Sequence, residues 1–192
     1  MRLEAPFTEE KIRALKVGDQ VEINGLIYTG RDAVHKYLHE GNVPPVDLRD
    51  GMIYHCGPVM VQGKAGWMVK AAGPTTSIRE EPFQHEIIRK FHLRGVIGKG
   101  GMGQKTLDAC REVGCVYLHA VGGAAQVLAE KVTKVHGVHL MELGSPEAIW
   151  VLEVKDFPAV VTMDAHGASV HKDLQEASGE KLRQLLAAIE AR

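Results

Sequence analysis

Residues 73–79, Gly-Pro-Thr-Thr-Ser-Ile-Arg, bring three hydroxyls and a guanidinium together in one short stretch. An apolar run at 67–72 precedes them, and a segment with Pro82 in its first turn and apolar residues at helical spacing follows. This pattern predicts a tight strand-to-helix turn. Backbone N–H groups at a helix start and a guanidinium both bind anions. The simpler interpretation is an ordinary helix start in which a Thr or Ser hydroxyl caps the first turn.

Two further glycine-marked turns carry cations: residues 28–32 contain Arg31, and residues 98–103 contain Lys99. In open α/β sheets such turns gather at the carboxyl ends of the strands, where ligands bind. We therefore expect Arg31, Arg79 and Lys99 to converge. A small dianion such as a dicarboxylate requires a forked donor at each carboxylate, with backbone N–H groups between them. For each cation taken alone, a solvated surface charge is the better explanation.

The glycine-rich stretch 98–103 also supports a function of a different class. It matches the Gly-x-Gly-x-x-Gly pattern of dinucleotide-binding turns, between a predicted strand and a predicted helix. The acidic residue expected about 20 residues later is missing, since no Asp or Glu lies between Glu112 and Glu130. The stretch is also a near miss for a phosphate-binding loop, because Gln104 interrupts the motif. A phosphate- or nucleotide-binding module is therefore the alternative.

Composition limits the classes of function. The chain has 192 residues, 45% of them hydrophobic, and a net charge of −1, so we expect a globular protein without a nucleic-acid or membrane partner. No apolar run approaches the ~20 residues of a membrane span. The first ten residues lack an apolar signal core. These observations predict a cytoplasmic protein.

The cysteines do not form a recognisable metal-binding pattern. There are three, Cys56, Cys110 and Cys115, without the Cys-x₂-Cys pairing of zinc or cluster sites. We expect them to be small buried residues and expect no metal ligands in this chain. His35 and His39 are four residues apart on a predicted helix, but an exposed helix face explains that spacing as well.

Strands and helices alternate along the chain, with hairpin-like pairs between them. The pattern predicts one α/β domain over residues 1–192, with a mixed sheet flanked by helices. Strands are expected at 21–28, 52–56, 67–72, 93–97, 115–120, 132–140, 148–154 and 159–163. Helices are expected at 9–15 with Thr8 as cap, at 33–40, after Pro82, at 104–113, at 124–131, and after a Ser178 cap with a stripe of Leu182, Leu185, Leu186 and Ile189.

Several motifs spread over residues 15–171 occur in the order of one known family. They are Thr-Gly-Arg-Asp-Ala at 29–33, the 73–79 turn, Gly-Lys-Gly at 98–100, Val-Gly-Gly-Ala at 121–124, Glu-Leu-Gly-Ser-Pro-Glu-Ala-Ile-Trp at 142–150 and Val-Lys-Asp-Phe-Pro at 154–158. Together they closely resemble the β subunit of class I, iron–sulfur-dependent fumarate hydratase and its sister L-tartrate dehydratase. The resemblance implies a swivelling β/β/α domain.

The resemblance also implies a division of labour between two subunits. In this family a 4Fe–4S cluster is held by three cysteines of an α subunit, or of an N-terminal domain, and its open iron binds substrate as a Lewis acid. This chain would bind no cluster itself. It would supply half of an active site for the reversible hydration of fumarate to L-malate, be inactive without the α subunit, and work in a heteromer of two or more subunits.

The resemblance also implies roles for individual residues in the three glycine-marked turns. Arg31 and Arg79 resemble the carboxylate clamps, Lys99 a further cation near the substrate, and Thr75 the group that takes the C3 proton of malate. A threonine hydroxyl needs nearby cations and a helix start to stabilise an alkoxide, so a purely orienting role for Thr75 is the alternative. Asp32 either pairs with a site arginine or caps a helix. The remaining substrate-binding candidates are Thr76, Ser77, Gly98 and Gly100.

Departures from the family pattern bear on the substrate. The Gly101-Met102 pair also occurs in tartrate dehydratases, whereas many fumarases have an arginine soon after the glycine. Residues 121–125 and the segment around Trp150 look more like fumarase. The resemblance therefore favours fumarate, with L-tartrate as the alternative; a β subunit that acts only as a binding module is a third. The two substrates differ in hydroxylation, on which a site can discriminate strongly.

Overall fold

A ring of five strands forms the centre of the protein. The computed structural model describes residues 1–64 and 66–190. Its main sheet has the order β1-β2-β3-β6-β7-β9-β8, and an additional pairing between β2 and β9 closes it. The expected mixed sheet is therefore confirmed, but it curls into a closed ring. The ring strands are β2 (Gln20–Thr29), β3 (Met52–Tyr54), β6 (Gly95–Gly98), β7 (Val116–His119) and β9 (Ile149–Met163).

Four of these strands run in the same direction. β2, β3, β6 and β7 pair in parallel, whereas β9 is antiparallel to β2, β7 and β8. Every residue of β3 and β6 is buried, as expected for short apolar strands covered on both faces. The carboxyl ends of the four parallel strands consequently meet at one edge of the ring.

The strand β9 corrects the sequence analysis, which predicted two strands at 148–154 and 159–163. It pairs with β2 from Tyr28↔Val151 to Gln20↔Val160, interrupted only by a register shift. Asp156 takes a positive φ of 49° at this irregularity, and its N–H donates to Asn24 Oδ1 at 2.9 Å. The gap predicted between the two strands is thus a bulge within one long strand.

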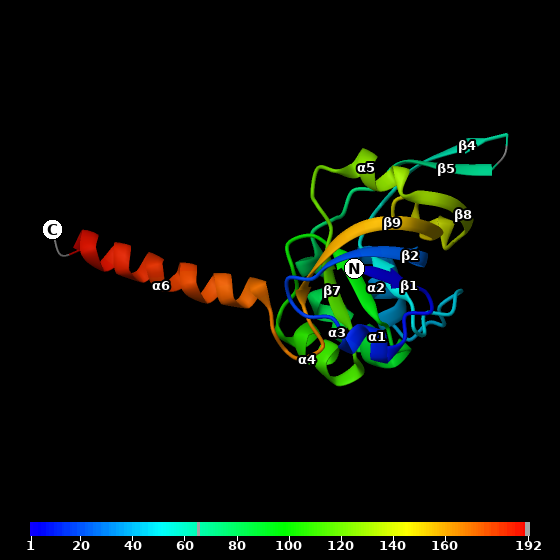
Figure 1. The fold of residues 1–192 in the computed structure, drawn as a ribbon. Helices are drawn as coiled ribbons and strands as arrows, with labels where there is room; N and C mark the ends of the chain where they lie inside the picture. Colours follow the sequence, from blue (N-terminus) through cyan, green and yellow to red (C-terminus); the bar gives the residue numbers. More distant parts are fainter. Residues whose placement is uncertain (65, 191–192) are drawn as a thin grey trace.

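The remaining strands lie outside the ring. β1 (Arg2–Glu4), which the sequence analysis missed, extends the sheet beside β2, and β8 (Val132–His139) lies on the other side of β9. β4 (Val59–Gly63) and β5 (Gly66–Ala71) form the predicted hairpin; Ala65 of its turn lies outside the described residues. This hairpin extends from the body beside β8 (Figure 1).

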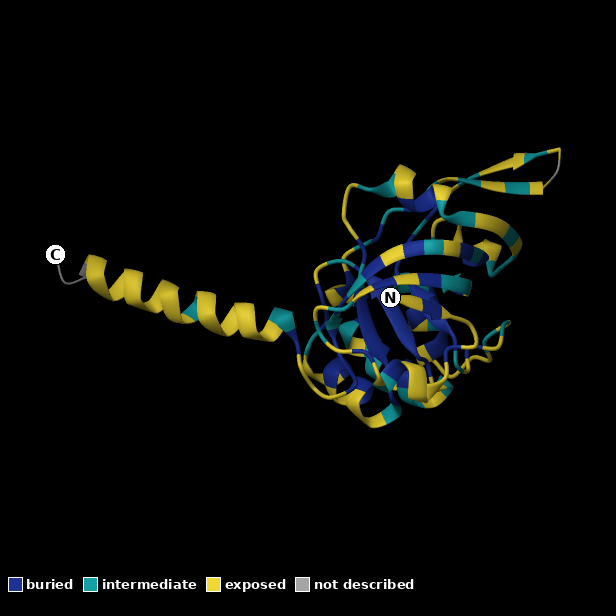
Figure 2. Ribbon diagram, viewed as in Figure 1, coloured by how far each residue is buried: buried dark blue, intermediate teal, exposed yellow. Residues whose placement is uncertain are grey.

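Helices on one side of the ring create a second core. α2 (Asp32–His39), α3 (Glu81–Phe91) and α4 (Gln104–Val113) pack apolar residues against the outer faces of the parallel strands. A separate apolar cluster lies within the ring, where β2, β3, β6, β7 and β9 all contribute. The buried residues of both cores are concentrated in the body of the molecule (Figure 2). α1 (Glu9–Arg13), capped by Thr8 as predicted, and α5 (Ala125–Glu130) complete this body.

The C-terminal helix α6 (Val170–Glu190) differs from expectation in its start and in its surroundings. It begins eight residues before the predicted Ser178 cap and projects away from the body (Figure 1). The predicted apolar stripe does not pack: Leu182, Leu185, Leu186 and Ile189 are 50–67% exposed. Helical spacing identified the helix correctly, because the spacing depends on local sequence alone, but spacing does not tell what covers the apolar face.

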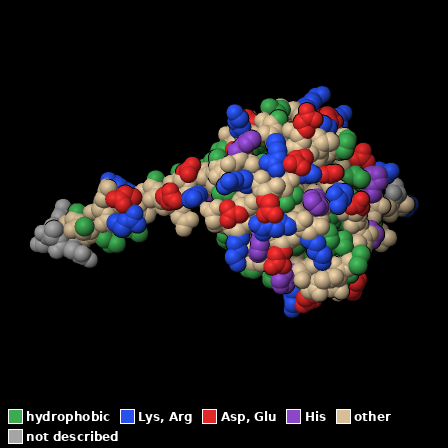
Figure 3. All heavy atoms as spheres, turned by 90° about the horizontal axis from the view of Figure 1, so that it is seen from below, with side chains coloured by type: hydrophobic (Ala, Val, Ile, Leu, Met, Phe, Trp, Pro, Cys, Tyr) green, Lys and Arg blue, Asp and Glu red, His purple; other side chains and the backbone are tan. Residues whose placement is uncertain are grey.

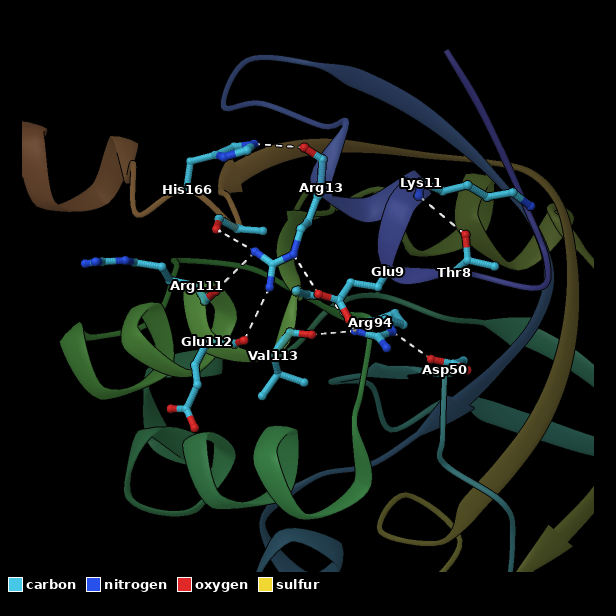
Figure 4. Close-up of polar contacts among 12 residues, drawn as sticks. Thr8, Glu9, Lys11, Arg13, Asp50, Arg94, Arg111, Glu112, Val113 and His166 are labelled. Carbon is cyan, nitrogen blue, oxygen red and sulfur yellow. Dashed lines mark hydrogen bonds and ion pairs between the residues drawn. The ribbon is translucent and has the colours of Figure 1, made fainter.

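Arginine side chains tie α1 to the end of α4. Arg94 is only 7% exposed; its Nε donates to Asp50 at 2.7 Å, and its Nη1 donates to the carbonyls of Val113 and Gly114. Arg13 reaches the carbonyls of Arg111 and Glu112 from α1. Figure 4 shows both guanidinium groups directed at these carbonyl oxygens. Cations at the last turn of a helix satisfy its unpaired carbonyls and oppose its negative end.

Replacing Arg94 with leucine should destabilise the chain by about 3 kcal/mol, because two buried carbonyls and Asp50 lose their donor. Urea unfolding followed by circular dichroism would measure the change. The matched control is Arg111→Ala, an exposed arginine on α4, which should change stability by less than about 0.5 kcal/mol. Equal stability of Arg94→Leu and the wild type would contradict a structural role for this network.

Surface charge is mixed. On the face shown in Figure 3, basic and acidic side chains alternate over the body, in line with the net charge of −1. Within residues 1–64 and 66–190, no helix combines the length and the apolar character needed to cross a membrane.

Candidate active site

Backbone hydrogen bonds fix the 73–79 turn at the carboxyl edge of the ring. Thr75 N–H donates to the His55 carbonyl at 2.7 Å, and Lys99 N–H donates to the Thr75 carbonyl at 3.2 Å. Ser77 N–H donates back to the Lys99 carbonyl at 3.0 Å, and Thr76 pairs with Lys99 as an isolated parallel bridge. The turn therefore extends the sheet between the ends of β3 and β6. This arrangement places Thr75 beside Lys99 independently of side-chain contacts.

Arg79 connects two of the predicted turns. It lies in η1 (Ser77–Glu80), the short 3₁₀-helix that follows the turn. Its Nη2 donates to Thr75 Oγ1 at 3.2 Å and forms an ion pair with Asp32 Oδ2 at 3.0 Å. Asp32 is the first residue of α2 and Arg31 takes the cap position, so Asp32 pairs with a site arginine instead of capping. Among the described residues, Nε and Nη1 of Arg79 make no hydrogen bond and can receive an anion.

Arg31 is held by a carboxylate that the sequence analysis did not single out. Its Nε lies 3.2 Å from Glu147 Oε1, in an ion pair without the alignment of a hydrogen bond. The other Glu147 oxygen accepts from Ala33 N–H at 3.0 Å. Gly57, after β3, leaves room for the guanidinium, because a Cβ there would lie 2.6 Å from Arg31 Nη1. Glu147 belongs to the 142–150 motif, which was the only signal that could have identified it.

Lys99 follows β6 and is half-buried. Its stem passes Gly122, in the turn after β7, since a Cβ at Gly122 would lie 3.4 Å from Lys99 Cδ. Lys99 forms no ion pair within the part of the chain that the structure describes. The carboxyl edge of the ring thus brings together all three predicted cations and the Thr75 hydroxyl.

Two predicted substrate-binding residues lie beneath this surface and not on it. Ser77 is fully buried, and a Cβ at the buried Gly98 would lie 1.9 Å from Ser77 Oγ. The side chain of Ser77 therefore packs into the floor of the site, which differs from the predicted direct contact. Thr76 and Gly100 are exposed, as a binding role requires. The capping interpretation of the turn does not hold, because Thr76 occupies the cap position of η1 without a side-chain hydrogen bond.

A buried chain of polar side chains, missed by the sequence analysis, forms this floor. His55 Nδ1 lies 2.8 Å from Ser77 Oγ, to which the Tyr117 hydroxyl donates at 2.8 Å. The Gln84 side-chain amide lies 2.8 Å from Nε2 of both His55 and His35. Burial, with a smaller contribution from the neighbouring His35, lowers the pKa of His55 to about 3. His35 and His55 are 20 residues apart and belong to no recognisable motif, so nothing in the sequence indicated that they lie together.

His55 makes stability depend on acid. The pKa of His55 in the folded chain is about 3, below its ordinary value of 6.5. The stability that the neutral imidazole contributes to the folded state is therefore complete above pH 6.5 and is lost as the pH falls toward 3. Between pH 7 and pH 5 we expect wild type to lose about 2 kcal/mol more unfolding free energy than His55→Gln. Urea titrations of both chains at these two pH values would measure the difference. Parallel losses in the two chains would contradict a neutral buried His55.

The glycine-rich loop 98–103 is not arranged to receive a phosphate. Glu81, the first residue of α3, places its carboxylate at the start of α4, where it accepts from the N–H groups of Gly103 at 2.8 Å and Thr106 at 3.2 Å. The Thr106 hydroxyl donates to the same carboxylate at 2.6 Å. The donors that would bind a phosphate at this helix start are therefore already satisfied by an anion.

The residues of this chain do not fit an iron–sulfur cluster. All three cysteines are free and buried, as predicted, and burial raises the pKa of Cys56 to about 12, which disfavours the thiolate that binds iron. Within residues 1–64 and 66–190, no three His, Cys, Asp or Glu side chains lie close enough to hold a metal ion.

Comparison with known proteins finds relatives that match most of this chain. A protein of Geobacillus stearothermophilus provisionally named a class I fumarate hydratase is 63% identical over 183 residues, which cover 95% of this chain and 35% of that protein. A protein of Methanocaldococcus jannaschii provisionally named L(+)-tartrate dehydratase subunit beta is 40% identical, with 94% and 95% of the two chains covered. The L(+)-tartrate dehydratase subunit beta of Escherichia coli K12 is 37% identical over 86% of this chain and 83% of its own.

The chain therefore spans about a third of the first of these relatives and nearly all of the second. A family profile described as the fumarase C-terminus matches residues 1–174, which include every site residue discussed above. The resemblance found in the sequence motifs is confirmed, and the chain belongs to the fumarase C-terminus family.

Proposed function

We propose that this chain is the β subunit of a two-subunit hydro-lyase that reversibly hydrates fumarate to L-malate. One observation carries the proposal: Arg79 Nη2 donates to the Thr75 hydroxyl, and the segments that carry Arg31 and Lys99 lie at the same edge of the ring. Two guanidinium groups suit the two carboxylates of a C4 dicarboxylate. The C–H bond that must be broken or formed lies between these carboxylates, where a hydroxyl between the clamps can reach it.

Each residue of the edge has a distinct task in this proposal. Arg31 and Arg79 bind one carboxylate each, and Asp32 and Glu147 hold the two guanidinium groups in place. Thr75 takes the C3 proton of malate and returns it in the hydration direction. Because Arg79 Nη2 donates to Thr75 Oγ1, a positive charge already faces the oxygen on which negative charge develops. Lys99 adds a second cation beside it, and Thr76 and Gly100 complete the surface.

The site is completed by a partner. Arg79 and Asp32 are 46% and 48% exposed, and an ion pair in contact with water contributes little. A docked α subunit would exclude water and strengthen every charge at the edge. We infer that this partner also carries the 4Fe–4S cluster, whose chemistry is Lewis-acid binding of the substrate hydroxyl. The assembly is a cytoplasmic heteromer, and this domain is of the swivelling β/β/α type.

L-Tartrate is the second candidate substrate. Two relatives that match along most of their length are named L(+)-tartrate dehydratase subunits. The higher identity of 63% belongs to the relative named for fumarate hydratase, and for this reason we place fumarate first. The same clamp geometry suits both dicarboxylates, so the assignment depends on activity.

Anaerobic reconstitution tests the proposal. The chain would be mixed with its cognate α subunit, and fumarate absorbance would be followed with L-malate, while oxaloacetate formation would be followed with L-tartrate. We expect malate turnover that neither subunit shows alone. Turnover of tartrate alone would replace the substrate and leave the site assignment intact. No turnover of either substrate by a complex that contains both subunits would refute the proposed function.

A further inference from the structure

Glu80 is a buried carboxyl group to which the reaction as described assigns no task. It follows Arg79 at the end of η1 and has no exposed surface. Neither carboxyl oxygen receives a hydrogen bond from an N–H or hydroxyl donor within the described part of the chain. Burying an ionised carboxylate without donors is strongly unfavourable. Glu80 must therefore be neutral or have a nearby cation.

The charged groups around Glu80 leave no cation available for it. Asp32, from α2, is the charged neighbour with the largest effect on Glu80, and Arg79 and Glu147 act on it more weakly. The Arg79 guanidinium is already paired with Asp32, and Arg31 is paired with Glu147. The three carboxyl groups thus face only two guanidinium groups, and the one left over is Glu80.

The nearest histidine does not compensate for this charge. His35 Nδ1 lies 3.6 Å from Glu80 Oε2 and donates to the carbonyl oxygen of Arg31 at 2.9 Å. A neutral His35 then accepts at Nε2 from the Gln84 amide, whose NH2 group would otherwise have no partner among the described residues. Burial lowers the pKa of His35, and His55, beyond the Gln84 amide, is neutral as well. Burial together with Asp32 raises the pKa of Glu80 to about 8. The charge of Arg79 acts in the opposite direction, but its effect is smaller than those of burial and Asp32.

We propose that Glu80 is a positioning residue that carries a proton at neutral pH and donates it in a hydrogen bond to Asp32, which keeps Asp32 ionised against Arg79. Loss of this proton places a second carboxylate behind the Arg79 guanidinium. The guanidinium is then drawn inward, away from the substrate carboxylate, and substrate binding weakens. The catalytic consequence rests on the proposed function, whereas the protonation of Glu80 does not.

The first test uses the chain alone. The pKa of Glu80 is about 8 in the folded chain and about 4.5 in the unfolded chain. The stability that protonated Glu80 contributes to the folded state is therefore complete below pH 4.5 and is lost as the pH rises toward about 8. Below about 6.5 the two buried histidines oppose this trend, so the clean window runs from about 6.5 to about 8. There the unfolding equilibrium constant of wild type should rise roughly tenfold per pH unit, and that of Glu80→Gln should rise much less. Equal slopes would overturn the proposal.

Infrared spectroscopy gives a second readout on the same chain. The wild type should show the carbonyl band of a protonated carboxyl at pH 7 that disappears above about pH 8, and Glu80→Gln should lack it. If ¹⁵N NMR instead shows His35 doubly protonated at pH 7, the proton resides on the histidine and the proposal is wrong.

The second test uses the reconstituted enzyme and a pH profile. Wild-type kcat/KM should fall above about pH 8, mainly through a rising KM, and this alkaline limb should be absent or shifted upward in Glu80→Gln. The matched control is Glu130→Gln, which removes an exposed carboxylate at the end of α5 and should retain the wild-type limb. An unchanged limb in Glu80→Gln, with a changed stability slope, would refute the positioning role. Absence of wild-type activity would refute the proposed function and leave the stability test valid.

Discussion

Replacing Arg79 with alanine is expected to lower kcat/KM of the assembled enzyme by about 100-fold or more. A charge-assisted hydrogen bond contributes about 1.5–3 kcal/mol, and Arg79 would lose one to a substrate carboxylate. It would also lose the contact with Thr75 Oγ1, which lies 3.2 Å from its Nη2. Asp32 would remain as an anion beside the substrate and add repulsion. Steady-state kinetics with malate would measure the effect.

Two control variants make this result specific. Arg79→Lys retains the charge but not the fork, so it should recover only part of the loss. Arg89→Ala removes an arginine that pairs with Glu112 on the surface of α3 and should leave kcat/KM within about twofold of wild type. Wild-type kinetics in Arg79→Ala would refute the clamp assignment, whereas a similar loss in Arg89→Ala would point to a general effect on the fold.

For Thr75→Ala we expect kcat to fall by about 10²–10⁴, the range of a positioned general base, with little change in KM. The main chain of residue 75 would keep its hydrogen bonds to His55 and Lys99, because they do not involve the side chain. The loss would therefore report on the hydroxyl alone. Single-turnover measurements would separate the chemical step from product release.

Thr75→Ser is the matched control, since it keeps a hydroxyl at the same position and should retain most of kcat. If Thr75→Ala raises KM and leaves kcat unchanged, Thr75 only orients the substrate, and the base lies elsewhere in the assembly. A solvent-exchange experiment adds a direct readout: the C3 proton of malate should exchange with water in wild type and much more slowly in Thr75→Ala.

The sequence allowed the convergence of the site to be predicted because topology follows from local pattern. Two of the three glycine-marked turns, at 28–32 and 98–103, follow parallel strands of the ring, as the pattern implied. The third, at 73–79, follows β5 of the separate hairpin and reaches the same edge by pairing with Lys99 after β6. Helix and strand positions were identifiable from periodicity for the same reason. The gap predicted between 154 and 159 was wrong, because a polar residue with a positive φ inside a strand cannot be told in the sequence from a loop between two strands.

The partners of the site residues could not be predicted in the same way. Glu147 is separated from Arg31 by more than a hundred residues and becomes its neighbour only when the β9 strand closes the ring. In the sequence Glu80 is one of two adjacent acids that nothing distinguishes, yet η1 buries it completely while Glu81 reaches the start of α4. Burial of a polar residue depends on packing in three dimensions, and a four-residue helix such as η1 is too short to show a periodic pattern in the sequence.

The backbone pairing of residues 75–77 with the end of β6 has a consequence for how such sites diverge. Thr75, Ser77 and Lys99 are positioned through main-chain atoms, so neighbouring side chains can be exchanged without displacing the reacting groups. Natural variation can then explore new substrates while the frame stays constant. Side chains around Thr75 and Lys99 can therefore be substituted while these two residues keep their positions. Enzymes with different substrate specificities can arise from such a fold by a few substitutions.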